Sequence, residues 1–226
     1  AETEKAVEHL HTLGLNRIAM VHVDDSFGED CLAGAMKGFK QTKLDPVTVI
    51  KADRSKPDYA AIVPQLTKAN AQAVIWIGSS VAVSDGVKAL RKAGSAMQVV
   101  TVSNNASSGF AKQLGDAVRG VIVTQVFPNE RAMGYPINRE AAALAKAQGD
   151  VTISPSVMEG FASAKVLVEG LRRAGPKPTR EKVVAALSGM NHFDLGGLEV
   201  GYGPNDRTGL SFVDLSIIDA NGQFRR

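Results

Sequence analysis

Polar side chains follow directly after three apolar stretches of the sequence, at positions where a strand would end and a helix would begin. The candidate ligand-binding residues at these three places are Asp25, Phe27, Ser79, Ser80, Ser103 and Asn104. The carboxyl ends of parallel strands meet at one edge of a sheet, so we expect these side chains to lie together as a rim. Hydroxyl, amide and aromatic groups suit hydrogen bonding and stacking of a small polar molecule. Because no histidine or other base accompanies the serines, the rim predicts binding of a ligand without catalysis.

Helix capping is the alternative explanation for the same residue types. Serine, aspartate and asparagine at βα turns can each cap a helix, and capping would account for every one of these positions separately. Ser79 and Ser80 also stand near the N-terminus of an expected helix, which favours an anionic group of a ligand. Both interpretations of the rim stay open on the sequence.

Sequence motifs for cofactors, phosphate groups and metal ions are missing. Residues 24–28 read DDSFG, so no glycine-rich dinucleotide fingerprint follows the first apolar stretch. Neither a P-loop nor the G-x-S-x-G elbow of α/β hydrolases occurs in the chain. His9 and His11 would point to different faces of a helix, which disfavours a zinc site. No cofactor and no metal are therefore expected, and a small α/β enzyme is kept as an alternative that predicts turnover.

Composition and charge narrow the class of protein. The 226 residues include 26 Lys and Arg against 23 Asp and Glu, a formal charge of +3, with 44% hydrophobic and 5% aromatic residues. The basic residues are scattered among acidic ones without a basic and aromatic stripe, so no nucleic-acid partner is expected. No apolar run reaches the length of about 18 residues that a membrane span needs. The single Cys31 excludes an intrachain disulfide, and the length allows one large or two small domains.

The first half of the chain predicts a doubly wound parallel sheet. Five apolar runs rich in Val and Ile are expected to be its strands: Arg17–Val23, Pro46–Ile50, Ala73–Ile77, Gln98–Val102 and Gly120–Val126. They are continuous rather than alternating, as in strands buried on both faces, and their starts are 22 to 29 residues apart, as in βαβ units. Helical patterns surround and separate them, at Glu2–Leu13, Gly28–Thr42, Pro57–Ala69, Val81–Ala93 and Ser108–Leu114. The fold class is therefore α/β over the first 126 residues.

The remainder of the chain has a different pattern. Three helices are expected at Ile137–Gln148, Val157–Ala174 and Arg180–Leu187, followed by a β-rich tail with Leu198–Gly201 and Ser211–Asp219. Ser156 and Glu159 have the spacing of a capping box at the start of the long helix. The apolar face of this helix includes Phe161, Val168 and Leu171, and no sheet in this part of the chain is expected to cover it.

Several stretches together carry a resemblance to a known family. They are Ile18–Asp30, Asp58–Leu66, Val87–Gly94, Leu114–Thr124, Glu159–Gly175, Pro178–Leu187, Gly196–Gly203 and Phe212–Phe224. In these stretches the chain resembles the type I periplasmic substrate-binding proteins of ABC importers, the group of leucine/isoleucine/valine-binding proteins. The resemblance runs over the whole length of the chain, and the combination of stretches is specific although each alone is weak.

The resemblance implies two lobes joined by crossovers. Residues 1–124 and 204–226 would form the second lobe as an α/β sandwich, and residues 130–200 would be the helical remainder of an incomplete first lobe. The crossovers would lie near residues 125–129 and 201–205. The strands of the first lobe would be missing, so a truncated or mature form without a signal peptide is expected. The missing lobe-one segment, or a neighbouring copy in a crystal or oligomer, would then cover residues 130–200.

The resemblance also implies roles within the rim. Phe27 matches a position where an aromatic side chain packs on the ligand, whereas Ser80 stands where a second aromatic is frequent. Ser103 stands where amino-acid binders place an acid that holds the ligand ammonium. A desolvated ammonium needs a charged partner, so this departure leaves recognition of an α-amino group open. A neutral amide, a carboxylate and an aromatic acid therefore stand beside leucine as candidate ligands.

The function that the resemblance implies is an extracytoplasmic, periplasmic solute receptor of an ABC importer. It would capture a small polar organic solute, such as an amino acid or an aromatic or other organic acid, in an interlobe cleft that closes by hinge bending. It would then pass the solute to a membrane permease, without catalysis. The alternative is the effector-binding core of a LacI-type transcription regulator, which has the same fold and would follow a DNA-binding helix-turn-helix.

Overall fold

The chain forms two compact units. The computed structural model describes residues 1–149, 151–203 and 205–226. Unit 1 consists of Ala1–Gln125 and Val213–Arg226, and unit 2 consists of Val126–Phe212. The resemblance implies a return to the second lobe at residue 204, whereas the chain returns to unit 1 at Val213, because Leu210 and Phe212 still pack against the core of unit 2. Pro204, within the expected second crossover, lies outside the described residues.

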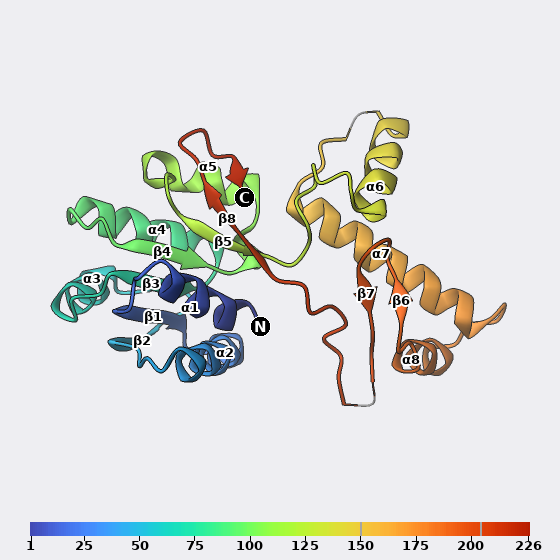
Figure 1. The fold of residues 1–226 in the computed structure, drawn as a ribbon, viewed down its shortest axis with the longest axis horizontal. Coiled ribbons are helices and arrows are strands. Elements are labelled where there is room, and N and C mark those ends of the chain that lie inside the picture. Colours follow the sequence, from blue (N-terminus) through green and yellow to red (C-terminus); the bar gives the residue numbers. More distant parts are fainter. Residues whose placement is uncertain (150, 204) are drawn as a thin grey trace. The chain divides into compact units, whose positions relative to one another are not determined.

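A seven-stranded mixed sheet forms the centre of unit 1 (Figure 1). Its strands are β1 (Ile18–Val23), β2 (Thr48–Ala52), β3 (Ala73–Ile77), β4 (Gln98–Thr101), β5 (Ile122–Gln125), β8 (Asp214–Ile218) and β9 (Phe224–Arg225), in the spatial order β2-β1-β3-β4-β5-β8-β9. β1 to β5 run parallel to one another, whereas β8 pairs antiparallel with β5 and β9 pairs antiparallel with β8. The prediction of a doubly wound parallel sheet is confirmed, and the C-terminal tail extends that sheet by two antiparallel strands.

The parallel strands are apolar without alternation because both faces of the sheet are covered. Every residue of β1, β3 and β5 is buried. β3 occupies the predicted residues Ala73–Ile77, and the ends of the other parallel strands differ from the prediction by at most two residues.

Helices cover both faces of this sheet (Figure 1). One face carries α1 (Glu2–Thr12) and α2 (Ser26–Thr42), and the other carries α3 (Tyr59–Lys68), α4 (Ser80–Lys92) and α5 (Ser108–Leu114). Successive side chains of a strand point to opposite faces of the sheet. Ile18 and Met20 of β1 therefore pack in the apolar core beneath α1 and α2, and Ala19 and Val21 pack in the apolar core beneath α3, α4 and α5. Two short 3-10 turns, η1 (Ser103–Asn105) and η2 (Gly115–Ala117), follow β4 and α5.

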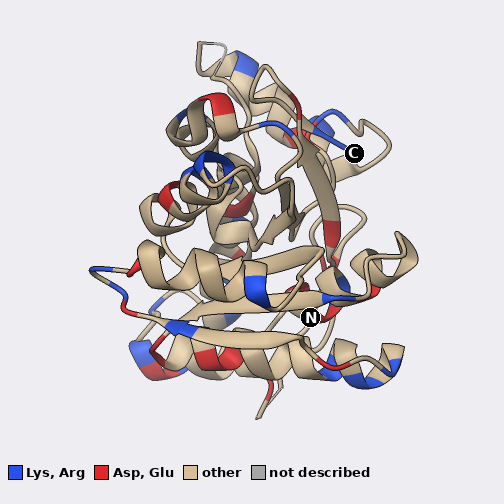
Figure 2. Ribbon diagram, turned by 90° about the vertical axis from the view of Figure 1, so that its left-hand side faces the viewer, with Lys and Arg blue, Asp and Glu red and all other residues tan. Residues whose placement is uncertain are grey.

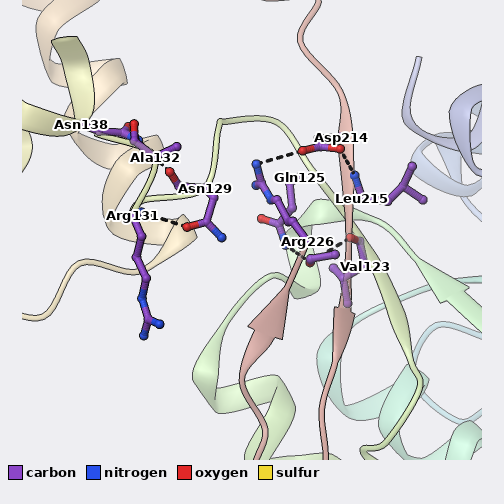
Figure 3. A network of polar contacts seen from close by, with 10 residues as sticks. Val123, Gln125, Asn129, Arg131, Ala132, Asn138, Asp214, Leu215 and Arg226 are labelled. Atoms are coloured by element: carbon purple, nitrogen blue, oxygen red, sulfur yellow. Dashed lines mark hydrogen bonds and ion pairs between the residues drawn. The ribbon is translucent and has the colours of Figure 1, made fainter. Parts of the chain in front are cut away.

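Polar contacts fasten β8 to β5 where the chain leaves unit 1 and re-enters it (Figure 3). Gln125 Nε2 donates to Ser216 Oγ at 2.7 Å, and Ser216 Oγ donates to the Val123 carbonyl at 3.3 Å. Arg226 pairs with Asp214 at 3.1 Å, and Asp214 stands opposite Gln125 in the strand register. Both connecting segments are therefore anchored on the sheet of unit 1.

In its described residues, unit 2 packs three helices and a two-stranded sheet around a small core. Its elements are α6 (Pro136–Ala147), α7 (Pro155–Ala174), α8 (Arg180–Ser188), β6 (Phe193–Asp194) and β7 (Glu199–Val200). Its core consists of Ile137, Ala141, Met158, Ala162, Leu195, Leu198 and Val200. Asn138 of α6 fixes the preceding loop, because its Nδ2 donates to the carbonyls of Asn129 at 2.7 Å and Ala132 at 3.0 Å (Figure 3).

The predicted start of the long helix is wrong. α7 begins at Pro155, in the first turn, where the missing N–H of proline costs nothing. Ser154 caps it, since its Oγ accepts a hydrogen bond from Val157 N at 3.3 Å. Ser156 and Glu159 therefore lie inside the helix and do not form a capping box at its start.

The apolar face of α7 is covered in part. Phe161 is half-buried and packs against the core of unit 2, to which β6 and β7 contribute. β7 lies within the predicted stretch Leu198–Gly201, whereas β6 and its pairing with β7 are not predicted. Val168 and Leu171 remain 65% and 39% exposed. The expectation of an uncovered face is therefore confirmed for Val168 and Leu171 and wrong for Phe161.

Acidic and basic residues are interspersed along the ribbon (Figure 2). Glu169 on α7 accepts hydrogen bonds from Arg172 at 2.8 Å and Arg173 at 2.7 Å, and these bonds lower the pKa of the Glu169 carboxyl to about 2. Among the described residues, no helix combines the length and the apolar composition that crossing a membrane would require.

Candidate functional site

The predicted rim residues lie in the turns after β1, β3 and β4. In the order β2-β1-β3-β4-β5, the direction of strand addition reverses between β1 and β3, and the crevice outside such a switch point is the usual ligand position in α/β sheets. Asp25 and Phe27 follow β1, Ser79 and Ser80 follow β3, and Ser103 and Asn104 follow β4. The residues therefore surround the switch point from three neighbouring strands.

Asp25 is engaged within its own turn. It caps α2 by accepting a hydrogen bond from Gly28 N at 3.0 Å, and it forms an ion pair with Arg54. The hydrogen bond from Gly28 is the main cause that lowers the pKa of the Asp25 carboxyl below its ordinary value, and Arg54 lowers it further. Capping accounts for Asp25, and its carboxylate already has a cationic partner.

Phe27 presents an aromatic ring at the same edge. It lies in the first turn of α2, directly after β1, and is 37% exposed, whereas Phe39 and Phe110 are buried in the two cores. An exposed ring beside polar groups provides a stacking surface for an apolar or planar part of a ligand.

Two basic residues from β2 and the loop after it approach the turn that follows β1, and nothing in the sequence signals this. Lys51 Nζ lies 3.2 Å from Asp24 Oδ1 and 2.6 Å from Glu29 Oε1. Arg54 pairs with Asp25 across 29 positions of the chain. Both acids that follow β1 are therefore neutralised by cations.

Ser79 and Ser80 have different partners. Ser79 Oγ caps α4 by accepting a hydrogen bond from Ala82 N at 3.3 Å, so capping accounts for Ser79. Ser80 Oγ instead donates to Asn105 Oδ1 at 2.9 Å, across 25 positions of the chain. This bond connects the turn after β3 with the turn after β4.

Two asparagines complete this connection. Asn105 is fully buried, and its Nδ2 donates to Thr101 Oγ1 at 2.9 Å and to the Gly78 carbonyl at 3.4 Å. Asn104 Nδ2 donates to the same Gly78 carbonyl at 3.1 Å. The structure thus brings Ser80, Asn104 and Asn105 together, and a satisfied buried amide makes the two turns rigid.

Ser103 is hydrogen-bonded to Glu2, a residue that the sequence does not place in the rim. Its backbone N–H donates to Glu2 Oε2 at 2.8 Å, and the hydroxyl of Thr124 donates to the same oxygen. Glu2 lies in the first turn of α1, where an acid is ordinary near the positive end of a helix, so nothing in the sequence signals a contact across 101 positions. A carboxylate therefore stands next to Ser103.

The nucleophilic and basic groups close to these turns are unsuited to catalysis. His22 of β1 is fully buried; its Nδ1 lies 3.0 Å from the Val23 carbonyl, and its Nε2 has no partner in the described part of the chain. Burial raises the pKa of the Cys31 thiol to about 12, and the charge of Glu2 adds to this shift. Within residues 1–149, 151–203 and 205–226, no group of three or more His, Cys, Asp or Glu could hold a metal ion. The rim can bind and orient a small molecule.

A surface cavity of about 440 Å³ lies away from the rim. It is lined by Lys88, Arg91, Leu114, Gly115, Asp116, Ala117 and Arg119, where α4 and α5 end. Those helix ends lead into the amino ends of β4 and β5, opposite the rim. Arg91 Nη1 is already engaged by the carbonyls of Ser95 at 2.8 Å and Met97 at 3.0 Å. None of the predicted site residues lines this cavity.

Comparison with protein families identifies one match over nearly the whole chain. The family described as periplasmic binding protein matches residues 1–222. No curated protein matches the chain significantly.

Solved structures match almost all of this chain but are longer than it. A substrate-binding periplasmic protein from Ralstonia solanacearum is 30% identical with a TM-score of 0.84, and the match covers 99% of this chain and 64% of that one. An extracellular ligand-binding receptor from Verminephrobacter eiseniae is 28% identical with a TM-score of 0.78, covering 100% of this chain and 65% of that one. A branched chain amino acid ABC transporter from Thermus thermophilus with bound valine shares the fold at 20% identity and a TM-score of 0.79, covering 99% and 63%. The chain therefore spans less than two thirds of the length of these structures.

Proposed function

This chain belongs to the family of periplasmic binding proteins, and we propose that it forms part of a periplasmic receptor that captures a small polar organic solute for an ABC importer. The receptor binds the solute without changing it chemically and delivers it to a membrane permease. The similarity to a substrate-binding periplasmic protein and, in fold, to an ABC transporter with bound valine supports this class of function.

The observation that carries the proposal is the rigid polar rim at the switch point of the sheet. Ser80 and Asn105 connect the turns after β3 and β4, and Asn104 is fixed on the Gly78 carbonyl. A rim that is already ordered loses little conformational entropy when a ligand binds. The exposed ring of Phe27 adds a surface on which an apolar part of the solute can pack.

We assign unit 1 to the complete second lobe and unit 2 to the helical part of the first lobe. The segments near residues 126–129 and 205–212, which connect the two units, are the proposed hinges. The anchoring of Gln125 to Ser216 and of Asp214 to Arg226 supports hinges that lie just outside unit 1. The remaining part of the first lobe covers the exposed Val168 on α7.

Calorimetric titration of the intact protein tests this function. The panel contains branched-chain and aromatic L-amino acids, aromatic carboxylic acids and short aliphatic carboxylates. We expect saturable binding of at least one of these classes and no conversion of the bound molecule. Phe27→Ala should weaken that binding roughly 2- to 10-fold, because an aromatic packing contact contributes roughly 0.5–1.5 kcal/mol beyond its buried area.

Leu13→Ala is the matched control for Phe27→Ala. Leu13 is 55% exposed and follows the last turn of α1, so its truncation removes an exposed apolar side chain at the helix end away from the rim. Its affinity should equal that of the wild type. Unchanged affinity in Phe27→Ala would remove Phe27 from the site, and turnover of any compound would favour the alternative of a small α/β enzyme.

A further inference from the structure

The surface cavity of about 440 Å³ at the ends of α4 and α5 is lined by unit 1 alone, since every lining residue belongs to Ala1–Gln125. Its volume is within the range of about 300–1,000 Å³ that is usual for small-molecule sites. Leu114 and Ala117 provide an apolar part of the lining. Gly115 has a φ of +55°, and a Cβ atom there would meet no atom within 4 Å, so no side chain fills the cavity from this turn. The cavity therefore has the size and the apolar lining of a site for a small molecule.

Positive charge predominates in the lining of this cavity. The cations are Lys88, Arg91 and Arg119, and the acid is Asp116. Lys88 pairs with Asp85 at 3.4 Å, but both side chains are exposed, and such pairs contribute little free energy. Among the described residues, neither Arg119 nor Asp116 forms an ion pair. The cavity therefore presents an excess of positive charge that the chain itself compensates only in part.

Arg91 is the cation that the fold holds in place. Its Nη1 donates to the carbonyls of Ser95 at 2.8 Å and Met97 at 3.0 Å, and its charge offsets the partial negative charge at the carboxyl end of α4. In the described part of the chain, no hydrogen bond is formed by Nε or Nη2. Burial lowers the pKa of the Arg91 guanidinium below its ordinary value, because the charged form loses solvation. A partly desolvated cation with unused donors forms strong hydrogen bonds with an oxyanion.

We propose that this cavity is a second ligand site of unit 1 and binds a small organic anion, with a carboxylate or phosphate group on an apolar body. The anionic group accepts hydrogen bonds from Arg91 and interacts with the charges of Lys88 and Arg119. The apolar body packs on Leu114 and Ala117. The inference goes beyond the proposed solute receptor and does not rest on it, because the cavity lies at the amino ends of β4 and β5, opposite the rim.

Calorimetric titration of the intact protein with phenyl phosphate, benzoate and inorganic phosphate tests this site. Saturable binding of phenyl phosphate or benzoate is expected, and it should be tighter than that of inorganic phosphate because the ring contacts the apolar lining. Tighter binding of phenyl phosphate would assign the cavity to phosphate esters, and tighter binding of benzoate would assign it to carboxylates. Inorganic phosphate that binds as tightly as either aromatic anion would overturn the assignment to an organic ligand.

Four variants locate the bound anion. Lys88→Gln and Arg119→Gln each remove one exposed cation of the cavity and should weaken binding about 2- to 5-fold. Lys92→Gln makes the same change at an exposed lysine of α4 that does not line the cavity, and it should leave the affinity unchanged. Phe27→Ala, at the rim, should also leave it unchanged.

Three results would overturn the second site. They are the lack of saturable binding of both aromatic anions, an equal loss in Lys92→Gln, and a loss in Phe27→Ala while Lys88→Gln and Arg119→Gln bind as the wild type does. The last result would place the anion at the rim and would leave the proposed solute-binding function intact. Because the three cations that are changed are exposed, the urea midpoint of these variants should equal that of the wild type.

Discussion

The backbone of Gly28 lies so close to Val23 that a Cβ atom at Gly28 would stand 1.9 Å from the Val23 carbonyl oxygen. The same atom would lie 2.8 Å from Nδ1 of His22. The first turn of α2 therefore packs directly on the end of β1, which places Phe27 at the strand edge and lets Asp25 accept the Gly28 N–H. Glycine is required here by this close approach.

Gly28→Ala should lower the free energy of unfolding by more than about 2 kcal/mol, because the added methyl group forces the helix away from the strand. Urea unfolding followed by circular dichroism measures the change. Gly109→Ala in α5 is the matched control, since the nearest atom to its Cβ would be 3.7 Å away, and it should be neutral or stabilising. Wild-type stability in Gly28→Ala would contradict the close approach.

Asn105→Ala should lower the free energy of unfolding by about 1–3 kcal/mol, because the hydroxyls of Ser80 and Thr101 lose the side chain that joins them. Solute affinity should fall as well, since the turns after β3 and β4 are no longer connected. Urea unfolding and calorimetry measure the two effects. Asn104→Ala removes an exposed amide and should cost less than about 1 kcal/mol of stability. Equal stability losses in the two variants would argue against the buried connection.

Ser216→Ala should destabilise the protein by about 1–3 kcal/mol, because the buried Nε2 of Gln125 loses its acceptor. The measurement is the urea concentration at the midpoint of unfolding, with the slope of the unfolding free energy against urea concentration unchanged. Ser211→Ala, which truncates an exposed serine just before the return to unit 1, should leave the midpoint unchanged. A midpoint that does not move in Ser216→Ala would mean that this hydrogen bond adds nothing to stability.

Cys31 should react slowly in the native protein. Burial, with a smaller contribution from the charge of Glu2, raises the pKa of its thiol to about 12, and only the thiolate is strongly nucleophilic. Labelling with iodoacetamide at pH 8, followed by mass spectrometry, should therefore be slow, should accelerate as the pH rises towards 12, and should become fast in urea. Glu2→Gln should label faster than wild type because one cause of the raised pKa is removed. Fast labelling of the native wild type at pH 8 would contradict the burial of this thiol.

The N-terminal caps of α7 and α8 show where a local sequence pattern predicts a helix start correctly and where it does not. Thr179 directly precedes α8 and caps it, with its Oγ1 accepting a hydrogen bond from Lys182 N at 3.3 Å. At α7 two serines compete, and the Ser156 and Glu159 spacing misleads because Pro155 is best accommodated in the first turn after Ser154. A local rule therefore succeeds where one candidate cap exists and fails where two lie within one turn.

The sequence by itself determined the fold class and the composition of the rim. A strand covered on both faces must be apolar at every position, so the sequence alone predicted both ends of the strand Ala73–Ile77. The polar residues that follow it could then be placed at the edge of the sheet where the strand ends. The tertiary structure decided which of those polar groups meet. Ser80 is hydrogen-bonded to Asn105, 25 positions away in the sequence, and Ser103 to Glu2, 101 positions away. The strand order and register bring these residues within hydrogen-bonding distance. Hydrogen bonds act over about 3 Å, and no local pattern of residues records which distant turns the sheet will bring that close.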